Sequence, residues 1–181
     1  MFRYRYFLLK RKVPETYHMA NQQFADEEHA QIYRVYRPDC PQEVADLIIS
    51  YLKEKFEGPL ETAVDVGCGS GQSTTILAPF FKHVHGLDVS EMQIKQAKKN
   101  LVLTNITYKV SPAEILPFET GSVQLVTAGA CLHWFQRDIF FPEVRRVLSN
   151  NGVFAAYTNH SLRPLVVDPV QAAEVDRLFY K

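Results

Sequence analysis

Three glycines at alternate positions, directly after an apolar run, give this chain its strongest chemical signal. The run begins at Ala63 as AVDV and continues as GCGSGQ, so Gly67, Gly69 and Gly71 follow a predicted strand. Glycine adopts backbone torsions that a Cβ would penalise, and it lets a ligand lie directly against main-chain N–H groups. The pattern therefore predicts a ligand-binding loop at the end of a buried strand.

The spacing of the glycines separates two kinds of nucleotide loop. In the dinucleotide fingerprint the third glycine comes three residues after the second, and in this chain that position holds Gln72. The third glycine comes one residue earlier, at Gly71, so the pattern is GxGxG. This argues against a nucleotide-dependent oxidoreductase, although such an enzyme shares the strand, the glycine loop and a following acid.

An acid follows the next predicted strand. The segment from Val84 to Ser90 reads as a short strand that ends in Asp88, seventeen residues after Gly71. A carboxylate at this place can accept both hydroxyls of a ribose, as in Rossmann-type sites. A turn residue ahead of a helix is the alternative for Asp88, and the glycine loop favours the ligand contact. The helix is predicted to start with Ser90 as N-cap and Gln93 three residues later, as in a capping box.

Together these residues resemble a known family. The stretch Asp65-x-Gly67-x-Gly69-x-Gly71 looks like motif I of the class I S-adenosylmethionine-dependent methyltransferases. Residues 20–160 are similar to the branch with the methyltransferase type 11 domain and the trans-aconitate methyltransferase-like proteins. The resemblance implies that S-adenosyl-L-methionine is the cofactor, and that no metal is needed. The cofactor-binding residues that it implies are Tyr33, Arg37, Asp65, Gly67, Cys68, Gly69, Gly71, Asp88, Val89, Ser111, Ala113 and Glu114.

Some of these implied contacts have alternatives. In the family an N-terminal segment folds over the cofactor, and Tyr33 and Arg37 would touch the cofactor or a substrate carboxylate, which a guanidinium holds through paired donors. A half-buried tyrosine and a surface arginine are the alternative. In the loop that borders the adenine ring, many members carry an aspartate where this chain has Pro112. The adenine contact would then pass to Ser111 and the backbone.

The pair His133-Trp134 follows the predicted central strand over 123–128. Open α/β sheets bind ligands at the carboxyl ends of their strands. An imidazole there could orient a nucleophile or take its proton, and Trp134 could wall the methyl-transfer cavity. These two are the predicted catalytic residues. Packing without a chemical role is the alternative for such a pair.

A helix must precede the glycine loop. Pro41 suits its first turn, and Gly58-Pro59 ends it after about Phe56. The apolar side chains that share its predicted inward face are Val44, Leu47, Ile48, Tyr51 and Leu52.

Further elements follow the acid. Strands are predicted over 105–110 and 153–157, with a turn at 150–152. The helix predicted over 138–148 points Arg145 and Arg146 outward.

The order of these elements predicts an α/β fold, the Rossmann-like three-layer sandwich of class I methyltransferases with a mostly parallel sheet. The family's sheet has the strand order 3-2-1-4-5-7-6, and this chain supplies only the first five strands. Strands six and seven are therefore expected to be missing, as in a truncated isoform or fragment. The expected segments are a disordered or alternative extension over 1–18, a helical cap over 19–60, the cofactor-binding core over 61–160 and a truncated segment over 161–181.

Composition limits the partners. The 181 residues are 46% hydrophobic and 22% charged, which is ordinary for one soluble domain. Twenty basic and twenty acidic residues give a formal net charge of zero, which lacks the electrostatic footprint of nucleic-acid binding. Three cysteines without CxxC spacing indicate a reducing compartment, and no apolar run approaches the roughly 18 residues of a membrane span. We expect a cytoplasmic protein with a small-molecule substrate and no nucleic-acid or membrane partner; its oligomeric state stays open.

The predicted function is methyl transfer from S-adenosyl-L-methionine to a small-molecule acceptor, with carboxylates as one acceptor class. The reaction would be an in-line attack on the sulfonium methyl, for which the enzyme supplies alignment and desolvation more than acid or base. A truncated cofactor-binding isoform with little or no activity is the alternative.

Overall fold

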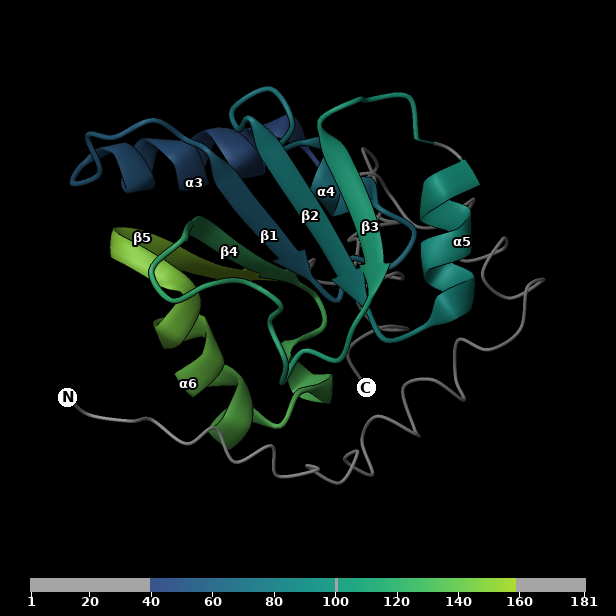
Figure 1. Ribbon diagram of the computed structural model, residues 1–181. Helices are drawn as coiled ribbons and strands as arrows, with labels where there is room; N and C mark the ends of the chain where they lie inside the picture. Colours follow the sequence, from purple (N-terminus) through teal and green to yellow (C-terminus); the bar gives the residue numbers. More distant parts are fainter. Residues whose placement is uncertain (1–39, 100, 159–181) are drawn as a thin grey trace, which may run out of the picture.

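Five strands form where short apolar segments of the sequence end in turn signals. The structure, a computed structural model, describes residues 40–99 and 101–158. In chain order the strands are β1 (Thr62–Val66), β2 (His83–Asp88), β3 (Ile106–Val110), β4 (Val123–Gly129) and β5 (Leu148–Tyr157). They form one sheet in the order β3-β2-β1-β4-β5 with every neighbouring pair parallel (Figure 1). The strand order reverses between β1 and β4, where open α/β sheets bind ligands.

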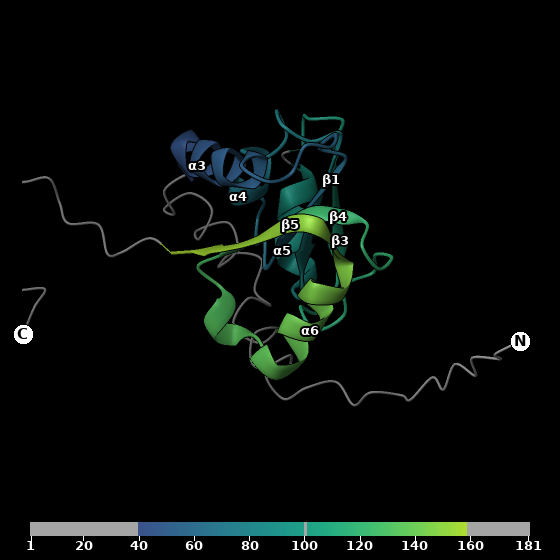
Figure 2. The ribbon, with the colours of Figure 1, turned by 90° about the vertical axis from the view of Figure 1, so that its left-hand side faces the viewer.

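Helices cover both faces of the sheet. They are α3 (Gln42–Lys53), α4 (Gln72–Thr75), α5 (Glu91–Lys99) and α6 (Arg137–Val147). The core beneath α3 and α5 is one hydrophobic cluster, and α6 packs into a second; Figure 2 shows α3 and α4 on one side, away from α6. Successive residues of β1 enter different clusters, Ala63 the first and Val64 the second, as expected of a central parallel strand. The predicted three-layer α/β fold is confirmed.

None of the described helices combines the length and the apolar character that crossing a membrane requires.

The fifth strand begins earlier than the sequence predicts. The predicted turn at 150–152 is wrong, because β5 already starts at Leu148 and its register with β4 shifts near this end. Asn151 has a φ of 60°, a conformation that asparagine tolerates better than most residues. Its Nδ2 atom donates to the carbonyl of Lys55 at 3.1 Å. The turn signal of the sequence therefore corresponds to an irregularity inside a strand.

The predicted inward face of α3 is wrong in part. Ala45, Ile49 and Leu52 are buried, whereas Leu47 and Tyr51 are 74% and 63% exposed. Apolar side chains surround much of this helix, so their spacing alone does not fix which side turns inward. The small side chain at position 45 occupies a place against the sheet that the sequence pattern assigned to larger residues.

β5 forms one edge of the sheet. Among the described residues no strand pairs with its outer side, and a groove of about 520 Å³ lies where β5 meets α6. Phe141, Val144 and Phe154 line this groove, and Phe141 is 41% exposed. The apolar cover of the sheet is therefore thinner at β5 than at the central strand β1.

Replacing Phe140 by alanine should destabilise the fold strongly. The Phe140 ring is fully buried between Phe135 and Phe154, whose ring centroids lie 4.8 and 5.7 Å away. Loss of a buried phenylalanine ring costs about 3–5 kcal/mol of unfolding free energy. The matched change Phe141→Ala removes the neighbouring, more exposed ring and should cost less than about 1.5 kcal/mol. Urea unfolding of both variants measures the difference, and equal losses would contradict this assignment of the core.

Candidate functional site

The glycine loop leaves β1 with its backbone in left-handed conformations. The φ angles are 69° at Gly67, 55° at Gly69 and 92° at Gly71, values that residues with a Cβ rarely adopt. The amides of Gly67 and Cys68 both donate to the carbonyl of Leu87 near the end of β2, at 2.7 and 3.0 Å. The loop is therefore tied to the neighbouring strand as well as to its own.

The three glycines differ in what surrounds them. A Cβ on Gly67 would lie 2.7 Å from the Sγ atom of Cys131, and one on Gly71 would collide with the ring of Tyr108. These two glycines let the protein's own side chains pack against the loop. A Cβ on Gly69 would meet a single side-chain oxygen within 4 Å, at 3.9 Å. Among the described residues, Gly69 is thus the part of the loop with open space beside its backbone.

Asp65 lies beneath this loop as a fully buried carboxylate. Its Oδ2 atom accepts hydrogen bonds from Ser73 Oγ at 2.8 Å and from Thr74 Oγ1 at 2.7 Å. Its Oδ1 atom accepts one from Thr127 Oγ1 at 2.8 Å. Hydroxyl donors from α4 and β4 thus give both carboxyl oxygens hydrogen-bond partners, as burial requires. The carboxylate holds the start of α4 against the sheet and so fixes the end of the glycine loop.

Asp88 lies at the end of β2, beside the loop. Its Oδ2 atom accepts the N–H of Gly69 and its Oδ1 atom accepts the N–H of Ser90, both at 2.8 Å. Burial raises the pKa of the Asp88 carboxyl above its ordinary value, while these N–H donors act in the opposite direction. A carboxylate offers about four acceptor positions. Asp88 therefore keeps acceptor capacity for donors from a ligand.

The segment after β3 reaches the same edge of the sheet. The N–H of Ser111 donates to the carbonyl of Asp88 at 2.9 Å. Ala113 is buried in the cluster that α6 covers, and Glu114 Oε1 accepts the N–H of Gln136 at 2.8 Å, just before α6. Of the residues predicted at the adenine side, Ser111 therefore lies beside Asp88, whereas Glu114 joins this segment to α6.

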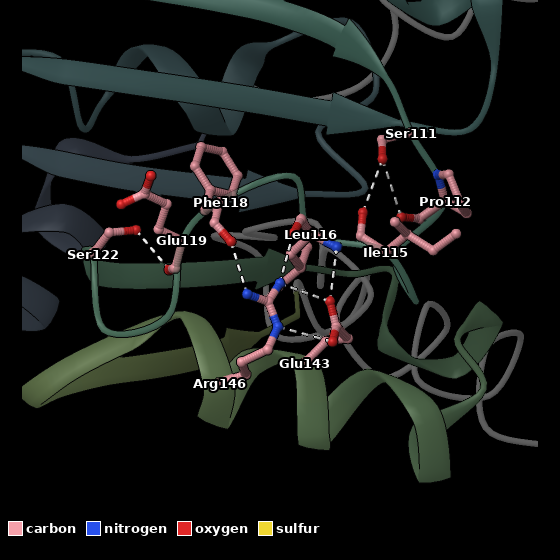
Figure 3. Close-up of polar contacts among 9 residues, drawn as sticks. All are labelled: Ser111, Pro112, Ile115, Leu116, Phe118, Glu119, Ser122, Glu143 and Arg146. Carbon is pink, nitrogen blue, oxygen red and sulfur yellow. Dashed lines mark hydrogen bonds and ion pairs between the residues drawn. The ribbon is translucent and has the colours of Figure 1, made fainter. Parts of the chain in front are cut away.

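An arginine holds the following part of this segment to α6 (Figure 3). Arg146 donates to the carbonyls of Leu116 and Phe118, both at 2.8 Å, and to the two carboxylate oxygens of Glu143, at 2.9 and 3.0 Å. Glu143 in turn accepts the N–H of Leu116 at 3.3 Å. The prediction that Arg146 points outward is wrong, because the guanidinium turns toward loop carbonyls and supplies their donors.

Backbone strain marks the segment after β4. Ala130 has a φ of 53°, a conformation that costs a residue with a Cβ roughly 1–2 kcal/mol. Its N–H donates to the carbonyl of Tyr157 in β5 at 2.7 Å. The 3-10 turn η1 (Leu132–Trp134) follows directly. Strained residues of this kind cluster at functional sites.

The predicted catalytic pair forms part of η1. The ring centroids of His133 and Trp134 are 5.0 Å apart, and the N–H of Trp134 donates to the carbonyl of Cys131 at 2.9 Å. His133 is exposed and Trp134 is half-buried. Because β1 and β4 are parallel neighbours, η1 follows the same edge of the sheet as the glycine loop. The exposed imidazole therefore belongs to a segment at that edge.

The remaining predicted residues are described in part. Cys68 is buried, and burial raises the pKa of its thiol well above the usual range, so the side chain stays neutral. Val89 is half-buried directly after Asp88. Tyr33 and Arg37 lie outside the described residues. Within the described ranges, no group of three or more His, Cys, Asp or Glu side chains could hold a metal ion.

Tyr108 is a residue of the site region that the sequence analysis missed. It pairs in register with Gly86 across β3 and β2, and its ring occupies the space where a Cβ of Gly86 would lie. Its hydroxyl donates to the carbonyl of Gly71 at 3.4 Å. The signal that could have found it is Gly86, because a glycine inside a predicted strand often marks the close approach of another group.

Replacing Arg146 by methionine should release the segment around Leu116. Two carbonyls lose a charged donor, so we expect the unfolding free energy to fall by about 1–2 kcal/mol. The matched change Arg145→Met, at the exposed neighbour, should stay within about 0.5 kcal/mol. Urea unfolding measures both, and amide hydrogen exchange around Leu116 should accelerate only for Arg146→Met. Equal effects of the two variants would contradict this role of Arg146.

The chain is similar to methyltransferases along most of the described region. The family model for the methyltransferase domain matches residues 64–156. A Dictyostelium discoideum protein named as a methyltransferase is 38% identical over 120 residues, which are 66% of this chain and 43% of that protein. A Saccharomyces cerevisiae protein named as an S-adenosylmethionine-dependent methyltransferase is 29% identical over 154 residues, 82% of this chain and 50% of that protein. The chain thus spans about half the length of these curated relatives.

Solved structures agree with this relationship. A structure from Anaeromyxobacter dehalogenans, described as a type II methyltransferase, has 40% sequence identity and a TM-score of 0.65, and the match covers 80% of this chain and 57% of that one. The geranyl diphosphate C-methyltransferase of Streptomyces coelicolor, solved with S-adenosyl-L-homocysteine, shares the fold at 23% identity and a TM-score of 0.55, over 64% of this chain and 45% of that one. The domain match, the parallel sheet and the glycine loop together make this chain a member of the methyltransferase domain family, the class I enzymes that use S-adenosyl-L-methionine.

Proposed function

We propose that this chain binds S-adenosyl-L-methionine at the carboxyl ends of β1, β2 and β4 and supports transfer of the methyl group to a small-molecule acceptor. The observation that carries the proposal is the pairing of Gly69 with Asp88. Open space lies beside the Gly69 backbone, and a carboxylate with remaining acceptor capacity is bonded to its N–H at 2.8 Å. This pairing occurs next to the reversal of strand order, where α/β sheets bind nucleotides.

The groups at this edge fit the cofactor. Asp88 would accept the ribose hydroxyls, and the backbone at Gly69 leaves room for the methionine and ribose portion. Ser111 and Val89, which flank Asp88, would border the adenine ring. When bound, the cofactor supplies an electrophilic methyl group on a sulfonium. The protein would contribute alignment of the acceptor and exclusion of water.

We favour a carboxylic acid as the acceptor class. A carboxylate is ionised at neutral pH, so it can act as nucleophile without giving a proton to a general base. His133 is exposed on η1 at the same edge of the sheet, and its imidazole would orient the acceptor through a hydrogen bond. Trp134 beside it would form an apolar wall of the cavity.

We also propose a cellular compartment and a class of substrate for the protein. No disulfide joins Cys40, Cys68 and Cys131 in the described part of the chain, which favours a reducing compartment such as the cytoplasm. A formal net charge of zero favours a small molecule over nucleic acid as the substrate.

Cofactor binding without turnover is the second candidate function, because the chain spans about half the length of its curated relatives. Binding and turnover are therefore measured separately.

A methyl group placed on Gly69 should block the cofactor. Gly69→Ala and Gly121→Ala form a matched pair, because both glycines have positive φ, 55° and 71°, and neither Cβ would collide with a described atom. Both variants bear a similar backbone strain of about 1–2 kcal/mol. Only Gly69→Ala places its methyl group in the glycine loop. We expect the Kd for S-adenosyl-L-homocysteine to rise roughly tenfold or more for Gly69→Ala alone, since tenfold corresponds to only 1.4 kcal/mol.

Calorimetric titration measures these affinities, and a labelled-methyl assay over a panel of carboxylic acids measures turnover. Binding with methyl transfer to a member of the panel supports the proposal in full. Binding without turnover of any acceptor class favours the second candidate. No binding by the wild-type chain would overturn the proposed function.

Cofactor affinity should fall on acidification at a higher pH than an ordinary aspartate would cause. Burial raises the pKa of Asp88 above 3.8, and a protonated carboxyl loses acceptor capacity for the ribose. The effect on stability has the opposite sign: the contribution of a carboxyl with a raised folded-state pKa is present at low pH and is lost as the pH rises through that pKa. Titrations with S-adenosyl-L-homocysteine between about pH 4 and 8 should show this loss for the wild type. Asp88→Asn should bind weakly without it, and identical profiles would count against Asp88 as ribose acceptor.

A further inference from the structure

Gln93, in the first turn of α5, has a buried acceptor without a partner. Its side chain is 2% exposed, and its Oε1 atom makes no hydrogen bond with any described residue. Buried polar side-chain atoms are nearly always paired, and each exception needs an explanation. The explanation here lies in the neighbours of Gln93.

The start of α5 shows why this amide is left over. In a capping box the N-cap hydroxyl accepts the N–H of the third helical residue, whose side chain accepts the N–H of the N-cap residue. The first half is present, since Ser90 Oγ accepts the N–H of Gln93 at 3.3 Å. The second half is missing, because the N–H of Ser90 donates to Asp88 Oδ1 at 2.8 Å. Asp88 has taken the donor that Gln93 would ordinarily bind.

The unpartnered oxygen lies close to the glycine loop. A Cβ on Gly69 would be 3.9 Å from Gln93 Oε1, which makes this oxygen the nearest described atom on that side of Gly69. The N–H of Gly69 now donates to Asp88 Oδ2 at 2.8 Å. One amide donor thus has a bonded acceptor, Asp88, and an unused acceptor nearby, Gln93.

Cofactor binding would change the demand on Asp88. The carboxylate already accepts the amide donors of Gly69 and Ser90, and the N–H of Val89 is a further backbone donor to it. Two ribose hydroxyls would bring its donors to five, one more than the about four positions that a carboxylate offers. A donor that can move to another acceptor relieves this crowding. Gln93 Oε1 is a nearby acceptor that has no hydrogen-bond partner in the structure.

We propose that Gln93 is a positioning residue for cofactor binding: its Oε1 atom accepts the N–H of Gly69 when the ribose engages Asp88. The proposal rests on the proposed function, because it needs a ribose at Asp88. In the free protein the unpartnered oxygen is destabilising. In the bound protein the same oxygen holds the loop in place, while Asp88 Oδ2 gives up the N–H of Gly69 and can accept a ribose hydroxyl.

The test uses Gln93→Met, which keeps the length of the side chain and removes the amide. If Gln93 were only structural, its loss would lower the Tm of the free protein. We expect instead an unchanged or higher Tm and a Kd for S-adenosyl-L-homocysteine about tenfold weaker, the effect of one lost hydrogen bond. Gln93→Leu serves as a second apolar variant. Gln96→Met makes the same change at the other buried glutamine of α5, three residues on, and should leave the affinity within about twofold of wild type.

An NMR readout follows the hydrogen bond itself. The amide proton signal of Gly69 should shift when S-adenosyl-L-homocysteine is added to the wild type, and the shift should be smaller in Gln93→Met at saturating ligand. Unchanged affinity in Gln93→Met, with weakened binding in Gly69→Ala and Asp88→Asn, would overturn the role of Gln93 and leave the proposed function standing. Absence of binding by the wild type would overturn both.

Discussion

The buried carboxyl group of Asp65 is the constraint on which the arrangement of the glycine loop depends. A carboxylate without solvent requires donors, and here the hydroxyls of Ser73, Thr74 and Thr127 supply them from α4 and β4. The bonds connect the two central strands with the first residues after the glycine loop. A buried carboxyl group without hydrogen-bond partners would cost free energy of folding. The start of α4 is therefore fixed against the sheet, and the loop between β1 and α4 has a fixed end as well as a fixed start.

The loop is also held from both sides by packing. The side chain of Cys131 lies against Gly67, and the Tyr108 ring lies against Gly71, so residues from the segments around β4 and from β3 enclose a loop that belongs to β1. Little conformational freedom then remains to be lost when a ligand binds, which favours affinity. Cys131 and Tyr108, which pack against the glycine loop, are therefore different residues from those expected to touch the ligand.

The sequence was sufficient to predict features that depend on neighbouring residues along the chain. Glycines with positive φ follow from their spacing after a strand, and the position of Asp88 follows from the end of the next one. The sequence was insufficient to predict features that depend on tertiary contacts. The outward assignment of Arg146 rested on helical periodicity, whereas its direction depends on carbonyls of a segment that precedes it by about thirty residues. Tyr108 was missed for the same reason, since only the pairing of β2 with β3 brings its ring over Gly86.

The hydrogen bond from Ala130 to the carbonyl of Tyr157 has a consequence for the segment that follows β4. It joins the last residue of β5, an edge strand, to the segment that carries η1, and it helps to hold Ala130 in a conformation that the residue does not favour. Peripheral strands open more often than central ones. Each opening of β5 at Tyr157 would remove the hydrogen bond to Ala130 and let that residue relax, two residues before η1 begins. The conformation of η1 is thus linked to the fraying of a strand that holds none of the predicted cofactor-binding or catalytic residues.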